Sequence, residues 1–216
     1  MASMNYLTPC TFDFGALQQA PKVLARLGGK RVFVVTDPGL QANGLLQNLL
    51  DALGTAPAGI FAETPSNPTE VAARDAAAGY RTAEADAIVA LGGGSSMDLA
   101  KLVGLMVTHE GPYERYGAAQ RGMRLIQKIP PLVAVPTTAG TGSEVSVGAV
   151  LILDSGRKET FVSPFLLPAH AICDPELTLG LPPLLTAATG MDAVTHCIEA
   201  VLSPLVHPPA EAIGLD

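Results

Sequence analysis

Short runs of Val, Ile, Leu and Ala recur along the chain, most of them bounded by glycine, proline or aspartate. They show no regular alternation with polar residues, and they occupy residues 31–36, 59–63, 87–92, 132–136 and 170–174. Continuous apolar runs of this length are typical of parallel strands that are buried on both faces. We therefore expect these runs to form one central parallel sheet.

Segments with apolar residues at helical spacing lie between these runs, at residues 39–53, 69–83 and 96–107. Alternation of such helices with buried strands predicts an α/β fold with a Rossmann-like parallel sheet. The runs on either side of Asp154-Ser155-Gly156, a turn-forming triplet, predict a β-hairpin inserted near residues 147–162.

The pattern changes at residue 182, because residues 182–203 are rich in Ala and Leu and lack β-branched runs. This composition favours a helical second domain. We expect an α/β domain over residues 1–181 and an incomplete helical domain over residues 182–216. A helix at 187–202 would leave an apolar face that normally packs on partner helices, so we expect a C-terminally truncated segment of a longer protein.

Composition excludes several classes of protein. The 216 residues are 48% hydrophobic and carry a formal net charge of −7. Without a basic stripe, we expect no binding to nucleic acid or to a membrane surface, and the most apolar stretch is interrupted by charges, so we expect no span. The three cysteines, Cys10, Cys173 and Cys197, are too few for a disulfide framework, so we expect a cytoplasmic protein. We expect each cysteine to be buried as a small hydrophobic residue.

A glycine-rich turn, Gly92-Gly93-Gly94-Ser95-Ser96, follows the run at 87–92 and precedes a helix expected to begin near Met97. Glycines let the backbone approach an anion closely, and a helix N-terminus points free N–H groups at it, so the turn predicts a diphosphate cradle. The spacing matches neither GxGxxG nor the Walker loop. The alternative is a plain strand-to-helix turn capped by Ser95 or Ser96.

Two further polar features follow strand ends. Residues 136–144 crowd hydroxyls with glycines, so this loop either wraps a polar ligand or bonds its own backbone. Asp37 follows the run at 31–36, where a carboxylate either meets an adenosine ribose and repels a 2′-phosphate, or caps a helix. Ligands of open α/β sheets bind beyond the carboxyl ends of strands, which favours a nucleotide site with NAD preferred over NADP.

Together these segments resemble the iron-containing (group III) alcohol dehydrogenases. The resemblance rests on Asp37 and, in order, on GGGSSMDLAK (92–101), PTTAGTGSEVS (136–146), DPELTLGLPP (174–183) and GMDAVTHCIEA (190–200). It implies an N-terminal α/β nucleotide-binding domain and a helical metal-binding domain, as in dehydroquinate synthase, with the active site in the cleft between them.

The resemblance also implies roles for individual residues. It implies that twelve residues contact the ribose, the diphosphate, or the adenine and nicotinamide halves of the dinucleotide. These are Asp37, Asn67, Gly93, Gly94, Ser95, Asp98, Thr137, Thr138, Thr141, Ser146, Lys158 and Leu177. Asp192 and His196 resemble the first two ligands of a catalytic divalent iron, with zinc as the second candidate.

Asp192 and His196 also have a structural alternative, because a carboxylate and an imidazole four residues apart stabilise a helix by roughly 0.2–0.5 kcal/mol. Catalytic metals usually need about three protein ligands, and the resemblance places the remaining histidine ligands beyond this chain. We therefore expect no closed metal site from this chain alone, and we identify no catalytic residue beyond the ligands.

The reaction implied by the resemblance is reversible hydride transfer between a primary alcohol or diol and nicotinamide, with the alkoxide held on divalent iron. The expected partners are a small alcohol or aldehyde, and further copies of the chain in a homodimer or larger homo-oligomer. Two alternatives stay open: a truncated nucleotide-binding or assembly module that catalyses nothing, and a maleylacetate reductase-like enzyme.

Overall fold

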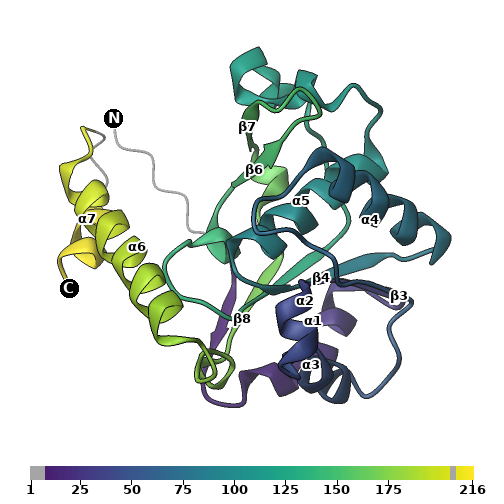
Figure 1. Ribbon diagram of the computed structural model, residues 1–216, viewed down its shortest axis with the longest axis horizontal. Helices are drawn as coiled ribbons and strands as arrows, with labels where there is room; N and C mark the ends of the chain where they lie inside the picture. The colour runs from purple at the N-terminus through teal and green to yellow at the C-terminus, as the bar shows by residue number, and fades with distance from the viewer. Residues whose placement is uncertain (1–7, 205–207) are drawn as a thin grey trace.

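The protein is built around a six-stranded parallel sheet with the strand order β1-β8-β5-β4-β2-β3 (Figure 1). The structure is a computed structural model that describes residues 8–204 and 208–216. The strands are β1 (Cys10–Phe12), β2 (Val32–Val35), β3 (Gly59–Phe61), β4 (Ala87–Gly92), β5 (Leu132–Pro136) and β8 (His170–Cys173). The expected α/β fold with a parallel sheet is confirmed.

Helices cover both faces of this sheet (Figure 1). Helices α4 (Glu70–Thr82) and α5 (Gly94–Thr108) pack on one face, and α1 (Ala20–Leu27), α2 (Pro38–Ala42) and α3 (Leu45–Leu53) pack on the other. Successive residues of a strand point to opposite faces, so Phe33 and Ile88 join the first core while Val34 and Val89 join the second. This two-sided burial explains why the strands read as continuous apolar runs.

The helix expected at residues 39–53 is two helices in the structure. Gly44 has a left-handed φ of 87° between α2 and α3, a conformation that glycine adopts without steric penalty and that ends a regular helix. Helix α5 begins at Gly94 rather than near Met97. Helix α1, of 8 residues, and strand β1, of 3 residues, were not predicted, because elements this short carry a weak pattern.

Four elements lie outside the six-stranded sheet and the helices that cover it. Strands β6 (Gly148–Ile152) and β7 (Lys158–Val162) form an antiparallel hairpin, and they still add Ala149, Leu151 and Phe161 to the first core beside α5. Helices α6 (Pro183–Leu202) and α7 (Pro208–Leu215) pack beside each other at a distance from α1–α4 (Figure 1). Every residue of α6 is at least partly exposed. The domain boundary at residue 182 stays a prediction.

Short 3-10 turns connect the main elements, at Ala16–Gln19, Tyr113–Tyr116, Ala118–Gln120, Gly122–Leu125, Ser143–Val145, Pro164–Leu166 and Pro175–Thr178. Within the described residues, every helix is too short or too polar to cross a membrane.

The expectation that the cysteines are buried is wrong. Cys10 and Cys197 are exposed, and Cys173 is half-buried. Cys10 and Cys173 lie on the neighbouring strands β1 and β8, with their sulfur atoms 3.5 Å apart. The sequence pattern could not predict this contact, because the two cysteines are 163 positions apart and meet only through strand β1, which was not predicted.

Candidate functional site

The site lies where the strand order of the sheet reverses. The reversal lies between the neighbouring strands β2 and β4, because the chain continues from β2 to β3 on one side and from β4 to β5 on the other. In open α/β sheets the crevice outside the carboxyl ends of the strands at such a point is the usual ligand site. Asp37, Gly93 and Thr137 each follow the end of β2, β4 or β5, so the fold brings three predicted segments to one edge.

A cavity of about 900 Å³ opens at this edge and is called the larger cavity below. Leu40, Leu45 and Leu185, from α2, α3 and α6, supply part of its apolar wall. The predicted residues on this wall are Asp37, Gly93, Gly94, Ser95, Thr137, Thr138, Thr141 and Leu177. An apolar wall with a few convergent polar groups suits a flat, partly polar ligand such as a nucleoside.

A second cavity of about 620 Å³, the smaller cavity, is lined by residues of the hairpin, α5 and α6. The predicted residues on its wall are Asn67, Gly94, Ser95, Asp98, Thr141, Ser146, Lys158, Asp192 and His196. The two cavities share Ser66, Gly94, Ser95 and Thr141, so they adjoin at the glycine-rich turn. Every predicted site residue therefore lines at least one cavity; their contacts with a ligand stay predictions.

The glycine-rich turn leaves the start of α5 available to a ligand. The N-cap of α5 is Gly93, which has no side chain to cap the helix. Ser95 instead donates to the Ser66 carbonyl oxygen at 2.6 Å, and Ser96 donates to Asp37 Oδ2 at 3.4 Å. The capping alternative for these serines is therefore wrong. Among the described residues no side chain caps the first turn of α5, which leaves its N–H groups available to an anion such as a diphosphate.

Buried hydroxyls provide a second sign of a polar ligand in the larger cavity. Thr64 Oγ1 and Thr138 Oγ1 are buried and find no hydrogen-bond partner within the described residues, yet both residues line this cavity. Buried polar groups are normally paired, so each such atom calls for an explanation. A dinucleotide fits here, because its polar groups can pair with these hydroxyls.

Asp37 caps α2, as the alternative for this residue anticipated. Its Oδ1 accepts hydrogen bonds from the backbone N–H of Gly39 at 2.9 Å and of Leu40 at 3.1 Å. The same side chain lines the larger cavity, so the cap holds the carboxylate at the rim. The ribose contact stays a prediction.

The loop after β5 is partly self-bonded. Thr141 Oγ1 accepts from the N–H of Ser143 at 3.3 Å, and Ser146 Oγ accepts from the N–H of Gly148 at 3.0 Å. These bonds match the connector alternative, whereas the unpaired hydroxyl of Thr138 matches the ligand alternative. The loop therefore combines the two alternatives: its own hydrogen bonds fix its shape, and the Thr138 hydroxyl is left without a partner among the described residues.

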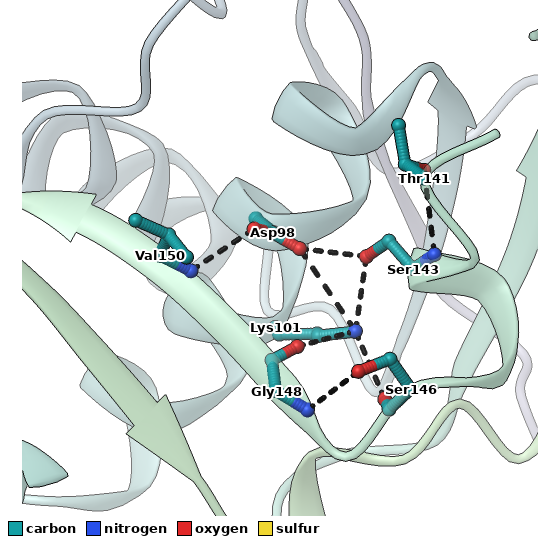
Figure 2. Close-up of polar contacts among 7 residues, drawn as sticks. All are labelled: Asp98, Lys101, Thr141, Ser143, Ser146, Gly148 and Val150. Atoms are coloured by element: carbon teal, nitrogen blue, oxygen red, sulfur yellow. Dashed lines mark hydrogen bonds and ion pairs between the residues drawn. The ribbon is translucent and has the colours of Figure 1, made fainter. Parts of the chain in front are cut away.

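Asp98 ties this loop and the hairpin to α5 (Figure 2). Ser143 Oγ donates to Asp98 Oδ1 at 2.6 Å, and the Val150 N–H donates to Oδ2 at 2.9 Å. Burial raises the pKa of Asp98, against the opposing effects of Ser143, Lys101 and Val150. Both carboxylate oxygens are thus engaged by the protein, so Asp98 shapes the wall of the smaller cavity besides lining it.

Asp192 and His196 lie one turn apart on α6 and face the smaller cavity. Asp192 Oδ1 lies 3.7 Å from His196 Nε2, and their side chains are 42% and 49% exposed. A carboxylate oxygen and an imidazole nitrogen suit divalent iron or zinc. Over residues 8–204 and 208–216, no group of three His, Cys, Asp or Glu residues is placed to hold a metal ion, and the metal-ligand role of Asp192 and His196 stays a prediction.

Comparison with known proteins decides the family. The profile of the iron-containing alcohol dehydrogenases matches residues 8–175. The chain belongs to the iron-containing alcohol dehydrogenase family. The match covers all six strands of the sheet, the glycine-rich turn and the loop after β5, and it ends before α6.

Relatives within the family share the fold at clear sequence identity. A 4-hydroxybutyrate dehydrogenase of Cupriavidus necator is 53% identical over 217 residues, which span 100% of this chain and 57% of that protein. A 1,3-propanediol dehydrogenase of Klebsiella pneumoniae is 39% identical over 98% of this chain and 56% of its own length. This chain thus spans little more than half the length of these relatives.

Solved structures give the same result. A sulfoacetaldehyde reductase from Bifidobacterium kashiwanohense, in complex with NAD+, superposes with a TM-score of 0.89 at 30% identity, over 99% of this chain and 57% of that one. A maleylacetate reductase from Agrobacterium tumefaciens superposes less closely, with a TM-score of 0.82 at 28% identity, over 100% and 54%. The maleylacetate reductase alternative is therefore not favoured.

Sequence reasoning missed several residues of the site. Gly140 packs against α6, since a Cβ placed on it would lie 2.4 Å from the Thr189 carbonyl oxygen and 3.1 Å from Asp192 Oδ2. Lys101 and Ser143 hold the loop to α5. The one signal in the sequence was a lysine three residues after Asp98 in an apolar helix, a spacing at which the two side chains meet.

Proposed function

We propose that this chain carries the dinucleotide-binding part, and two metal-ligating residues, of an NAD-linked alcohol dehydrogenase. One observation carries the proposal: the uncapped start of α5 lies on the wall shared by two cavities, and the smaller of them also holds Asp192 and His196. A diphosphate at the shared wall would leave one half of a dinucleotide in each cavity. The proposed metal ligands Asp192 and His196 support the smaller cavity as the side of the reaction.

Bound nicotinamide would accept the hydride, and divalent iron would polarise the alcohol oxygen. The chain's own residues have other tasks. The N–H groups that follow Gly93 would bind the diphosphate, and the hydroxyls of Thr64 and Thr138 would hold the half in the larger cavity. Asp192 and His196 would supply a carboxylate oxygen and an imidazole nitrogen to the iron.

We propose a short primary alcohol as the substrate, and ω-hydroxy acids are the first class to test. A relative that is 53% identical is a 4-hydroxybutyrate dehydrogenase, and another that is 39% identical is a 1,3-propanediol dehydrogenase. Asp37 at the rim of the larger cavity favours NAD, since its charge would repel a 2′-phosphate. Assembly into a homodimer or larger oligomer is also proposed; light scattering on purified protein tests it.

Calorimetric titration of NAD and NADH into the purified chain tests the binding part of the proposal. We expect binding of both; a folded sample that releases no heat with either ligand would refute it. Turnover is tested by loading the protein with divalent iron or zinc and following NADH formation with 4-hydroxybutyrate, 1,3-propanediol and 1-butanol. Turnover in none of them, despite NADH binding, would remove the catalytic part for this chain and leave the binding part.

A further inference from the structure

Lys101 is a fully buried lysine in the interior of α5, with 0% of its side chain exposed. An ammonium group in such a position is costly unless each of its three N–H donors finds an acceptor. Three acceptors are present (Figure 2): Ser143 Oγ at 3.0 Å, the Ser146 carbonyl oxygen at 3.0 Å and the Gly148 carbonyl oxygen at 2.7 Å. All three belong to one short segment of chain.

This segment, residues 141–150, is called the anchored loop. Asp98, one turn before Lys101, binds its Ser143 hydroxyl and its Val150 N–H. The two α5 side chains thus engage the anchored loop at both of its ends and in its middle. The predicted ligand contacts Thr141 and Ser146 are bonded to positions two residues further on, so fixing the anchored loop fixes them.

The anchored loop also forms the wall between the glycine-rich turn and α6. Thr141 lies against Gly94, since a Cβ on that glycine would be 3.0 Å from Thr141 Cγ2. Gly140, the residue before the anchored loop, packs against Asp192 of α6. A shift of the loop would therefore change the smaller cavity at the turn and beside the metal-ligand pair together.

We propose that Lys101 is a positioning residue that fixes the anchored loop on α5 and thereby shapes the smaller cavity for the nicotinamide half of a dinucleotide. Lys101 itself lines neither cavity, so it acts through the loop and not by touching the ligand. The inference rests on the proposed function, because it takes the cavity of Asp192 and His196 as the nicotinamide side. Binding in the larger cavity, which is lined by Asp37 and Leu177, serves as the internal comparison, because the anchored loop should affect it less.

The test compares two ligands that differ by the nicotinamide ring. Lys101→Met keeps the length of the side chain and removes its donors. We expect NADH to bind this variant about tenfold more weakly than the parent chain, because binding would then have to order the anchored loop that Lys101 no longer holds. ADP-ribose, which lacks the ring, should change by less than about twofold. Both affinities come from calorimetry.

Two further variants keep the result interpretable. Lys22→Met removes an exposed lysine of α1 and should leave both affinities unchanged. Ser143→Ala removes one acceptor of Lys101 and one donor to Asp98 while leaving the ammonium in place. It should weaken NADH binding in preference to ADP-ribose binding. Ser143 also lines the smaller cavity, so a preferential loss supports the role of the anchored loop, and the absence of any preference contradicts it even if Lys101→Met does not fold.

Three outcomes would overturn the positioning role. In the first, a folded Lys101→Met chain binds NADH as tightly as the parent. In the second, the Lys101→Met chain loses affinity for NADH and ADP-ribose equally, which indicates a general loss of structure. In the third, Ser143→Ala weakens the binding of both ligands equally or of neither. A parent chain that binds neither ligand would instead refute the proposed function itself, and the positioning role would fall with it.

Discussion

Replacing Gly94 with alanine should weaken dinucleotide binding without lowering the stability of the fold. Gly94 is the first residue of α5 and lines both cavities. The added methyl carbon would lie 3.0 Å from Thr141 Cγ2 and 3.1 Å from Thr141 Cβ, where ordinary contacts begin at 3.4 Å. Thr141 must therefore move by a few tenths of an ångström, and the new methyl group narrows the approach to the N–H groups of the turn.

The two effects have different magnitudes. Alanine favours helix over glycine by about 0.5–1 kcal/mol in a helix interior and by less at a first residue such as Gly94. This gain partly offsets the displacement of Thr141, so the free energy of unfolding should stay within about 1 kcal/mol of the parent value. Binding has no such offset, because a diphosphate depends on close approach of the backbone. We expect a loss of about tenfold in NADH affinity, which corresponds to about 1.4 kcal/mol.

Urea unfolding and NADH calorimetry on the same samples measure the two quantities. Gly79→Ala is the matched control, because its methyl group in α4 would meet Phe33 Cζ at 3.2 Å, a similar crowding among residues that line neither cavity. Its NADH affinity should equal that of the parent chain. The reasoning fails if Gly94→Ala binds NADH as well as the control does, or if its stability falls together with its affinity.

Other substitutions test single features of the site. Asp37→Asn keeps an oxygen to cap α2 but removes the charge, so the ratio of NADP to NAD affinity should rise; an unchanged ratio in titrations would contradict the repulsion argument. Gly140→Ala should lower the melting temperature and weaken divalent metal binding near Asp192, since its methyl would meet a backbone oxygen of α6 at 2.4 Å and its φ of +96° strains alanine. Gly156→Ala has a similar strain at φ +80° with no described atom within 4 Å, and it should leave metal binding unchanged. Burial lowers the pKa of Lys101 to about 8 from 10.5, against the opposing charges of two nearby carboxylates. Between these values the unfolded chain holds a proton that the folded chain has released, so the contribution of Lys101 to the free energy of unfolding should rise with pH by up to about 3 kcal/mol; urea titrations at several pH values should show this rise as a growing difference between the parent chain and Lys101→Met.

The sheet was predictable because its pattern is local. Strands such as β4 and β5 are buried on both faces, so their side chains are apolar without interruption. The position of the site followed from the same pattern, since the carboxyl ends of parallel strands meet at one edge and carry Asp37, the glycine-rich turn and the loop after β5. The break at Gly44 was not predicted, because a single glycine is compatible with either a helix or a turn.

The contacts that hold the site together were beyond local pattern. Lys101 and Ser143 are 42 positions apart, and Cys10 and Cys173 are 163 apart. Each pair meets only after the strands have been placed in order. Helical spacing could pair Lys101 with Asp98, but it could not indicate that both side chains would bind the loop after β5.

A buried lysine and aspartate are a poor choice for stability alone, because well-packed apolar residues of similar volume are often as stable or more so. The anchored loop supplies the reason for their presence. Its Ser146 and Gly148 carbonyl oxygens point at α5 and need donors there, and leaving each unpaired would cost about 1–3 kcal/mol. An apolar residue at position 101 would therefore favour other conformations of the loop. In the proposed function the first turn of α5 would bind the ligand, while Asp98 and Lys101, further along the same helix, hold the anchored loop that forms part of the wall of the smaller cavity.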